Sequence, residues 1–396
     1  MILTNHKCTE LGLIPEDWDI VSLREIGSFS KGKGISRAEA NSGNIPAIRY
    51  GEIYTVHNDY IKEFFSFISE EVALSSKKLN YGDVLFTASG ETKEDIAKAV
   101  AYITKDKEAY AGGDIIILSP TCEVDSMYLG YVLNTKEVIR QRMSKAQGDA
   151  VVHITTDAVS SIQIPFPPLK EQKAIAKALS DVDCLIESIA ALVAKKRNIK
   201  QATMQQLLTG KTRLSGFSGH WVEYEIGNFV PKKGEQINKS VLSSNVYGYP
   251  VMNGGIQPSG YFSQYNTTAN SVIISEGGNS CGYVNYMKTP FWAGGHCYVL
   301  TNLEGMDVNY IYQSLKYNEP QIMGLRSGSG LPNIKKSTLC KHKIYITTSL
   351  SEQQAISKVL YDMDENIASL QQQKAKYESI REGMMQELLT GKIRLV

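Results

Sequence analysis

Only a few residues of this chain have the types and spacing that a catalytic or phosphate-binding site requires. The segment Thr209-Gly210-Lys211-Thr212 resembles the end of a phosphate-binding loop. That loop needs a glycine five residues before Gly210, and Gln205 occupies this position. A phosphate loop also opens a helix, whereas this segment closes one. We therefore interpret it as a helix cap.

Carboxylates and possible metal ligands are equally sparse. The nearest approach to a nuclease set is Asp83, Glu91 and Lys93, a combination that arises often by chance. The pair His296-Cys297 and the pair Cys340 and His342 match no zinc-binding spacing. We predict no catalytic residue and no metal site in this chain.

Glycine-rich polar loops remain as the candidates for binding. Glycine lets a backbone approach a DNA duplex closely, arginine and lysine suit guanine, and asparagine and glutamine suit adenine. For each single residue, a solvated loop with an incidental charge is an open alternative. If the partner is a DNA duplex, the residues that we predict to contact it are Lys31, Lys33, Arg37, Arg49, Lys93, Gln147, Lys232, Lys233, Asn253, Gln257, Asn279, Arg326 and Lys335.

Length and composition are those of a globular protein with more than one core. The chain has 396 residues, of which 42% are hydrophobic and 21% are charged. No apolar run approaches the roughly 20 residues of a membrane span, and no signal peptide is visible. Six cysteines without a C-x-x-C pair are typical of reduced thiols. We predict a cytoplasmic protein that contacts no membrane.

Charge is unevenly distributed, although the net charge is only +1. Residues 1–165 carry −6 and residues 166–214 carry +5. A chain that grips DNA alone normally has a clearer basic excess. If DNA is the partner, we therefore expect weak, salt-sensitive binding by the isolated chain.

An internal repeat is the strongest signal in the sequence. Residues 169–214 recur at 350–395, and 23 of the 46 aligned residues are identical. Each copy opens with Leu-x-Glu-Gln and closes with Leu-Leu-Thr-Gly-Lys. Chance does not produce such a match, so the chain contains a duplicated module.

Each copy of the repeat predicts one long helix with a heptad stripe of apolar residues. Ser349 and Glu352 predict a capping box, and Gly210 and Gly391 stand where a helix-ending glycine belongs. An apolar stripe needs a cover, either the other helix, which we favour, or a globular neighbour. The residues that we predict to pair the helices are Ile175, Leu179, Val182, Ile186, Ile189, Ile356, Leu360, Met363, Ile367 and Leu370.

The segments before the two helices resemble each other faintly. Trp18 and Trp221 each precede Glu-Ile-Gly, and Gly112-Gly113 matches Gly294-Gly295. Two similar scaffolds with different surfaces would give this pattern, as would ordinary drift after duplication. We predict four segments, namely globular domains at 1–166 and 215–347 and helical regions at 167–214 and 348–396.

This order of segments and the paired helix signatures resemble the specificity subunit of Type I restriction–modification enzymes over essentially the whole chain. The resemblance implies an α+β fold, in which two mixed α/β target recognition domains are joined and spaced by an antiparallel coiled coil of two long helices. It further implies a non-catalytic reader of a bipartite double-stranded DNA site. Its expected partners are two methylation subunits and, in the full complex, restriction subunits. S-adenosylmethionine, ATP and Mg would belong to those partners, and this chain would hold no cofactor.

Three other functions stay open at this point. One is an enzyme with an unrecognised site, which would show turnover by the purified chain. The chain could serve a restriction–modification architecture whose methylation and cleavage functions share one partner chain. It could also be a coiled-coil adaptor that binds proteins alone, which would have no effect on DNA methylation.

Overall fold

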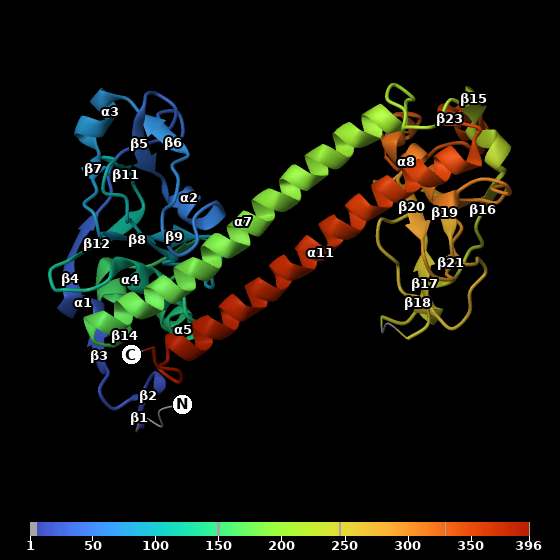
Figure 1. The fold of residues 1–396 in the computed structure, drawn as a ribbon. Coiled ribbons are helices and arrows are strands. Elements are labelled where there is room, and N and C mark those ends of the chain that lie inside the picture. Colours follow the sequence, from blue (N-terminus) through green and yellow to red (C-terminus); the bar gives the residue numbers. More distant parts are fainter. Residues whose placement is uncertain (1–5, 149–150, 245–246, 329, 396) are drawn as a thin grey trace. The chain divides into compact units, whose positions relative to one another are not determined.

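The computed structural model describes residues 6–148, 151–244, 247–328 and 330–395. The chain divides into two compact units, Met1–Ser188 with Lys374–Val396, and Ile189–Gln373. Two long helices, α7 (Leu169–Leu207) and α11 (Leu350–Leu388), each contribute one part to each unit (Figure 1).

The first unit is built on two four-stranded sheets. The first has the order β10-β8-β12-β4 and is antiparallel throughout, and the second has the order β6-β5-β11-β7 with a parallel β5–β11 pair. The strands of the first sheet are β4 (Gly27–Lys31), β8 (Val84–Thr87), β10 (Ala99–Ala101) and β12 (Ile115–Pro120). Those of the second are β5 (Ile45–Ile48), β6 (Ser66–Ile68), β7 (Lys77–Lys78) and β11 (Tyr110–Ala111).

Among the described residues, three two-stranded pairs and six short helices complete the first unit. The pairs are β1 (His6–Thr9) with β2 (Gly12–Pro15), β3 (Asp19–Ser22) with β14 (Gln163–Phe166), and β9 (Ser89–Gly90) with β13 (Val152–His153). The helices are α1 (Leu23–Ile26), α2 (Tyr50–Thr55), α3 (Glu70–Ser75), α4 (Ser126–Val132), α5 (Lys136–Lys145) and α6 (Thr156–Ser160).

The second unit repeats the four-stranded main sheet of the first, but its smaller sheet has three described strands in place of four. Its main sheet has the order β16-β22-β19-β20 and its smaller sheet the order β18-β17-β21, again with one parallel pair, β17–β21. The strands are β15 (Trp221–Glu225), β16 (Pro231–Lys233), β17 (Tyr249–Met252), β18 (Tyr261–Phe262), β19 (Ser271–Ser275), β20 (Val284–Met287), β21 (Trp292–Ala293), β22 (Cys297–Leu300) and β23 (Lys343–Thr347). The short helices are η1 (Ile226–Phe229), η2 (Lys239–Val241), α8 (Val308–Tyr317), α9 (Glu319–Gly324) and α10 (Lys336–Lys341). The two mixed α/β domains predicted from the sequence are confirmed.

Each unit has its own apolar core, and both long helices enter both cores. In the first unit, β8 and residues 115–118 of β12 are fully buried, and the two strands pack with Leu179 of α7 and Leu388 of α11. In the second unit, β19 packs with Leu207 of α7 and Leu360 of α11. The residues predicted to pair the helices are therefore covered partly by globular neighbours, because Ile175 and Leu179 lie in the first core and Ile356 and Leu360 in the second.

The sequence made two predictions about the ends of the long helices, and one of them is confirmed. Gly210 and Gly391 lie just past the helices with positive φ angles, +68° and +71°, as a helix-ending glycine requires. The predicted capping box of Ser349 and Glu352 is only half formed. The Ser349 hydroxyl accepts the Glu352 backbone N–H at 3.4 Å, but the Glu352 carboxylate does not return to Ser349. That prediction was wrong because the carboxylate has buried partners elsewhere.

Among the described residues, no helix is both long and apolar enough to cross a membrane.

Candidate nucleic-acid interface

Backbone hydrogen bonds join the predicted binding loops of the first unit into one row. The Gly113 N–H donates to the Gly34 carbonyl at 2.9 Å, and the Ala88 N–H donates to the Asp114 carbonyl at 2.8 Å. The row continues where the Ile154 N–H donates to the Ala88 carbonyl at 3.0 Å. Loops that are far apart in sequence thus meet along one edge of the unit.

The second unit repeats two bonds of this row with different side chains. The Glu276 N–H donates to the His296 carbonyl and the Ile334 N–H to the Glu276 carbonyl, both at 2.8 Å. These bonds correspond to those of Ala88, so Glu276 replaces an alanine and His296 replaces Asp114. The two edges share a backbone arrangement but differ in chemistry.

Most predicted DNA-contacting residues of the first unit are exposed. Lys31 ends β4, Lys33 donates its backbone N–H to the Ala111 carbonyl, and Arg49 precedes α2. Lys33, Lys93 and Gln147 lie on the loops of the row, whereas Arg49 is only half exposed. The exposed members of the predicted set in this unit are Lys31, Lys33, Arg37, Lys93 and Gln147.

In the second unit, two of the predicted residues already have partners within the chain. The Lys233 ammonium pairs with the Glu276 carboxylate at 2.7 Å, and the Asn253 side-chain oxygen accepts the His296 N–H at 3.3 Å. Asn253 thereby shapes its own loop. The predicted residues that are exposed in this unit are Lys232, Lys233, Gln257, Asn279, Arg326 and Lys335.

Glu276 is a residue at this edge that the sequence analysis did not single out. Its carboxylate also accepts the Tyr298 hydroxyl at 2.9 Å, and this contact together with burial raises the pKa of Tyr298. A lone glutamate before Gly277-Gly278 carries no spacing signal, so only the fold could place it beside Lys233.

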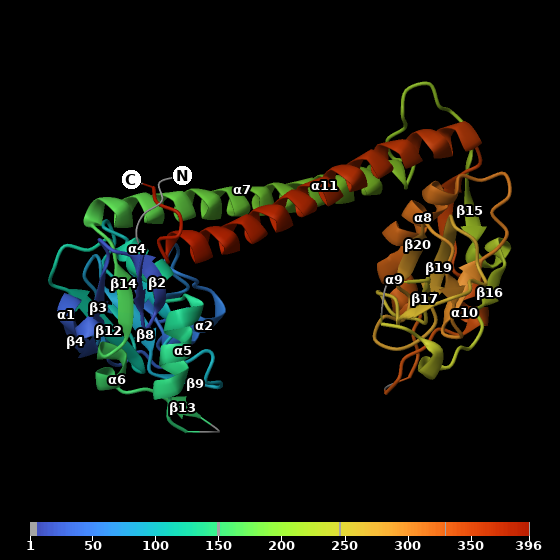
Figure 2. The same cartoon turned by 90° about the horizontal axis from the view of Figure 1, so that it is seen from below.

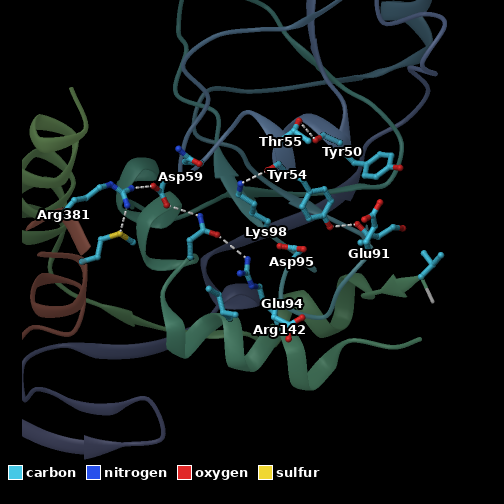
Figure 3. A pocket seen from close by; sticks show the side chains of 18 residues that line it. Tyr50, Tyr54, Thr55, Asp59, Glu91, Glu94, Asp95, Lys98, Arg142 and Arg381 are labelled. Atoms are coloured by element: carbon cyan, nitrogen blue, oxygen red, sulfur yellow. Dashed lines mark hydrogen bonds and ion pairs between the residues drawn. The ribbon is translucent and has the colours of Figure 1, made fainter. Parts of the chain in front are cut away.

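A cleft of about 990 Å³ opens beside the row in the first unit, lined by α2, the segment after β8, α5 and part of α11 (Figure 3). Arg142 is 2% exposed, donates to the Ala97 carbonyl at 2.6 Å, and has its pKa lowered by burial to about 10. Lys98 donates to the His57 carbonyl at 2.7 Å, and burial also lowers its pKa. Both cations support the loops rather than projecting into solvent.

Arg381 of α11 reaches this cleft and joins three elements. Its guanidinium pairs with Asp59 of the globular part (Figure 3), and it also pairs with Asp183 of α7. The equivalent place in the second unit pairs Lys200 with Asp364 at 2.7 Å. Polar residues of the helix stripes thus form buried or half-buried ion pairs in both units.

The repeated helix signatures have a structural role that the sequence analysis missed. The Glu171 carboxylate is fully buried and accepts bonds from Trp18 Nε1 at 2.9 Å and from Arg394, which also pairs with Asp17 at 2.9 Å. Arg394 follows the end of α11, so the closing signature of one copy binds the opening signature of the other.

The second unit has the reciprocal arrangement. Glu352 is fully buried and accepts Arg213 Nε at 2.5 Å, Arg213 Nη2 at 2.8 Å and the Thr347 hydroxyl at 2.6 Å. We call these two sites the Glu171 clamp and the Glu352 clamp. The adjacent glutamines also match, since Gln172 accepts the Asp125 N–H and Gln353 the Asp307 N–H, both at 2.9 Å.

Among the described residues, no three His, Cys, Asp or Glu side chains gather where they could hold a metal ion. The polar groups of each unit instead join loops to one another and helices to domains.

The duplicated fold has a direct counterpart among known families. The family model described as "Type I restriction modification DNA specificity domain" matches the chain twice, at residues 15–195 and 219–379. The chain belongs to the family of Type I restriction–modification specificity subunits. A specificity subunit recognises DNA for the complex and is not its catalytic component.

Relatives and solved structures agree with this family. The MjaX specificity subunit assigned in Methanocaldococcus jannaschii is 27% identical, with 99% of this chain and 97% of that protein covered. The MjaVIII specificity subunit of the same organism is 24% identical, with 96% and 94% covered. The crystal structure of the S subunit from Mycoplasma genitalium has a similar fold, with a TM-score of 0.67, 18% identity, and 94% and 96% covered.

Proposed function

We propose that each globular domain of this specificity subunit reads one half of a bipartite DNA site through its row of loops. The observation that carries this proposal is the repeated edge, where the same backbone hydrogen bonds present different side chains in the two units. A shared scaffold with different surface chemistry suits two different half-sites. Each matched base pair contributes roughly 1–3 kcal/mol, so two half-sites together discriminate far better than one.

We further propose that α7 and α11 set the spacer between the half-sites and hold two methylation subunits, joined by restriction subunits in the full complex. S-adenosylmethionine, ATP and Mg are then held by those subunits. The predicted segments 1–166, 167–214, 215–347 and 348–396 are the functional divisions of this proposal. Methylation subunits that surround the DNA would supply phosphate contacts that the acidic first domain lacks.

The first experiment is single-molecule sequencing of the source organism's methylome, with and without this gene. Loss of methylation at one split motif, two short half-sites with an unspecified spacer, is the expected result. Persistence of every modified motif in a strain that expresses the protein would contradict the proposal and favour the protein-binding adaptor.

The spacer role has its own test. Deleting residues 189–195 and 370–376, one heptad from equivalent places in both helices, shortens each helix by about 10 Å and keeps the heptad phase. The complex should then prefer a spacer that is shorter by about three base pairs, or lose binding to the original site. An unchanged spacer preference in a folded variant would refute this role. Deleting a heptad from α7 alone is the control, since it disturbs the packing of the two heptad stripes without shortening both helices.

A further inference from the structure

The described residues that bracket one loop form the same backbone bridge in both units, although the sequence of the loop has diverged. Gln147 and His153 form an isolated antiparallel bridge, and Ser327 and Asn333 form the same bridge in the second unit. Both bridges span six residues, and both are followed by a buried isoleucine. In Figure 2, β13, which follows this loop in the first unit, lies on the side of that unit away from α7.

A glycine with a positive φ angle stands at the same position of each loop. The φ angles are +96° for Gly148 and +100° for Gly328. A side chain at Gly148 would lie 2.3 Å from the Val151 carbonyl oxygen, and the equivalent distance from Gly328 to the Leu331 oxygen is 3.5 Å. The two glycines thus occupy equivalent positions, directly after the first residue of each bridge. Val151 and Leu331, each three residues after its glycine, are equivalent as well.

Both of these positions hold an exposed aliphatic side chain. Val151 is 54% exposed and Leu331 is 87% exposed. A single exposed aliphatic residue needs no explanation. Its recurrence at one position of two loops that share little else in sequence indicates a common use.

The surroundings of Leu331 favour DNA as what this side chain contacts. Residues 325–341 contain Arg326, Lys335, Lys336 and Lys341 and no acidic residue. Arg326, Lys335 and Lys336 are all exposed. Cations on both sides of the loop suit the phosphates of a duplex, which would bring the aliphatic side chain against base edges.

We propose that Leu331, and Val151 at the equivalent position, each contact the 5-methyl group of a thymine in the major groove. This methyl group is the apolar feature that the major groove offers, and it distinguishes an A·T pair from the others. The inference rests on the proposed reading of one half-site by each domain. It makes each loop a specificity determinant that works by apolar contact beside the hydrogen-bonding residues.

The test compares thymine with uracil, which lacks the methyl group and keeps every hydrogen-bonding group. The assembled complex with its methylation subunits is titrated with duplexes in which each thymine of the target is replaced in turn. At one position in the half-site read by the second domain, uracil should weaken binding by the wild-type complex about three- to five-fold, as expected for one lost methyl contact. Leu331→Ala should bind both duplexes equally at that position and keep the other preferences.

Controls keep the outcomes distinct. Leu74→Ala removes the same side chain from a residue that is 90% exposed on α3, and it should leave the uracil effect in the second half-site unchanged. Val151→Ala should abolish a uracil effect in the other half-site only.

Target binding with no uracil effect at any position would overturn this inference alone. A uniform loss of binding by Leu331→Ala to all duplexes would also overturn it. Leu331 would then support the loop or contact the duplex at every sequence, without recognising a methyl group. Absence of target binding by the wild-type complex would refute the proposed function and the inference together.

Discussion

The loop edges of the two units share the backbone hydrogen bonds of Ala88 and Glu276, but the side chains at the equivalent positions differ in charge. Ala88 and Asp114 in the first unit correspond to Glu276 and His296 in the second. The clamps are the reverse case, because Glu171 and Glu352 have the same type of partner in both units. Residues that join helices to domains were retained after duplication, whereas residues on the edge diverged, as expected if the edge alone determines the target.

The largest effect should come from removing a clamp. Glu171→Ala leaves the buried Trp18 indole without its acceptor and leaves Arg394 with Asp17 as its remaining carboxylate partner, which should lower the free energy of unfolding of the first unit by about 3–5 kcal/mol. Glu352→Ala should cost the second unit less, because the Arg213 side chain is 27% exposed, against 11% for Arg394, and can regain water. Hydrogen exchange resolved by peptide measures both units. Equal losses would contradict this ranking, and Lys177→Ala, at an exposed ion pair, is the control.

Base recognition comes next in size. Arg326→Ala should relax specificity at one position of one half-site by about 1–3 kcal/mol and leave the other half-site unchanged. Competition binding with single-base variants of the target measures this effect. Arg197→Ala, at an exposed position of α7, is the control. A loss at both half-sites would mean that Arg326 supports the fold.

Acid should destabilise the first unit through His57. Burial, reinforced by the Lys98 ammonium, lowers the pKa of His57 from 6.5 to about 4. The unfolded chain therefore takes up a proton below pH 6.5 that the folded chain refuses, so stability falls between pH 6.5 and 4 by at most about 1.4 kcal/mol per pH unit.

Unfolding of wild type and His57→Gln between pH 7 and 5 checks this prediction. In the variant, the stability of the first unit should depend less on pH, by the amount expected for the uptake of one proton on unfolding. His220→Gln, at an exposed residue, should behave as wild type. An identical pH dependence of His57→Gln and wild type would contradict the prediction.

The smallest effect concerns the Lys233–Glu276 pair. Glu276→Gln removes a carboxylate from the edge and frees the Lys233 ammonium for a phosphate. DNA binding by the complex should strengthen several-fold at low salt, and the slope of log K against log salt should steepen by about one. Lys233→Gln should leave the slope unchanged or shallower. A weaker affinity of Glu276→Gln would indicate that Glu276 contacts a base.

The sequence predicted the features that recur along the chain. The repeat indicated both helices, and Gly210 and Gly391 their ends, because helix periodicity and a positive-φ glycine are local properties. The clamps escaped prediction because Glu171 and Arg394 are 223 residues apart, and the sequence gives no sign that the signatures of different copies meet. For the same reason Glu352 was assigned to a local capping box rather than to Arg213.

The candidate interface was predictable in outline only. Glycine-rich loops with basic residues could be recognised, and the fold brings several of them into one row. The pairing of Lys233 with Glu276 depends on strands that meet only in the folded sheet. The equivalence of Val151 and Leu331 is likewise hidden in the sequence, since it rests on bridges and φ angles rather than on shared residues.

The Glu171 clamp also bears on synthesis of the chain. At about 5–20 residues per second, the ribosome adds Arg394 some 10–45 seconds after Glu171. Arg213 is instead made 139 residues before Glu352, so the Glu352 clamp can close as soon as its glutamate emerges. The second unit is one continuous segment and can fold during translation, whereas the first must wait for the last residues of the chain. A truncated product would therefore keep an intact second unit and leave Glu171 buried without its cation.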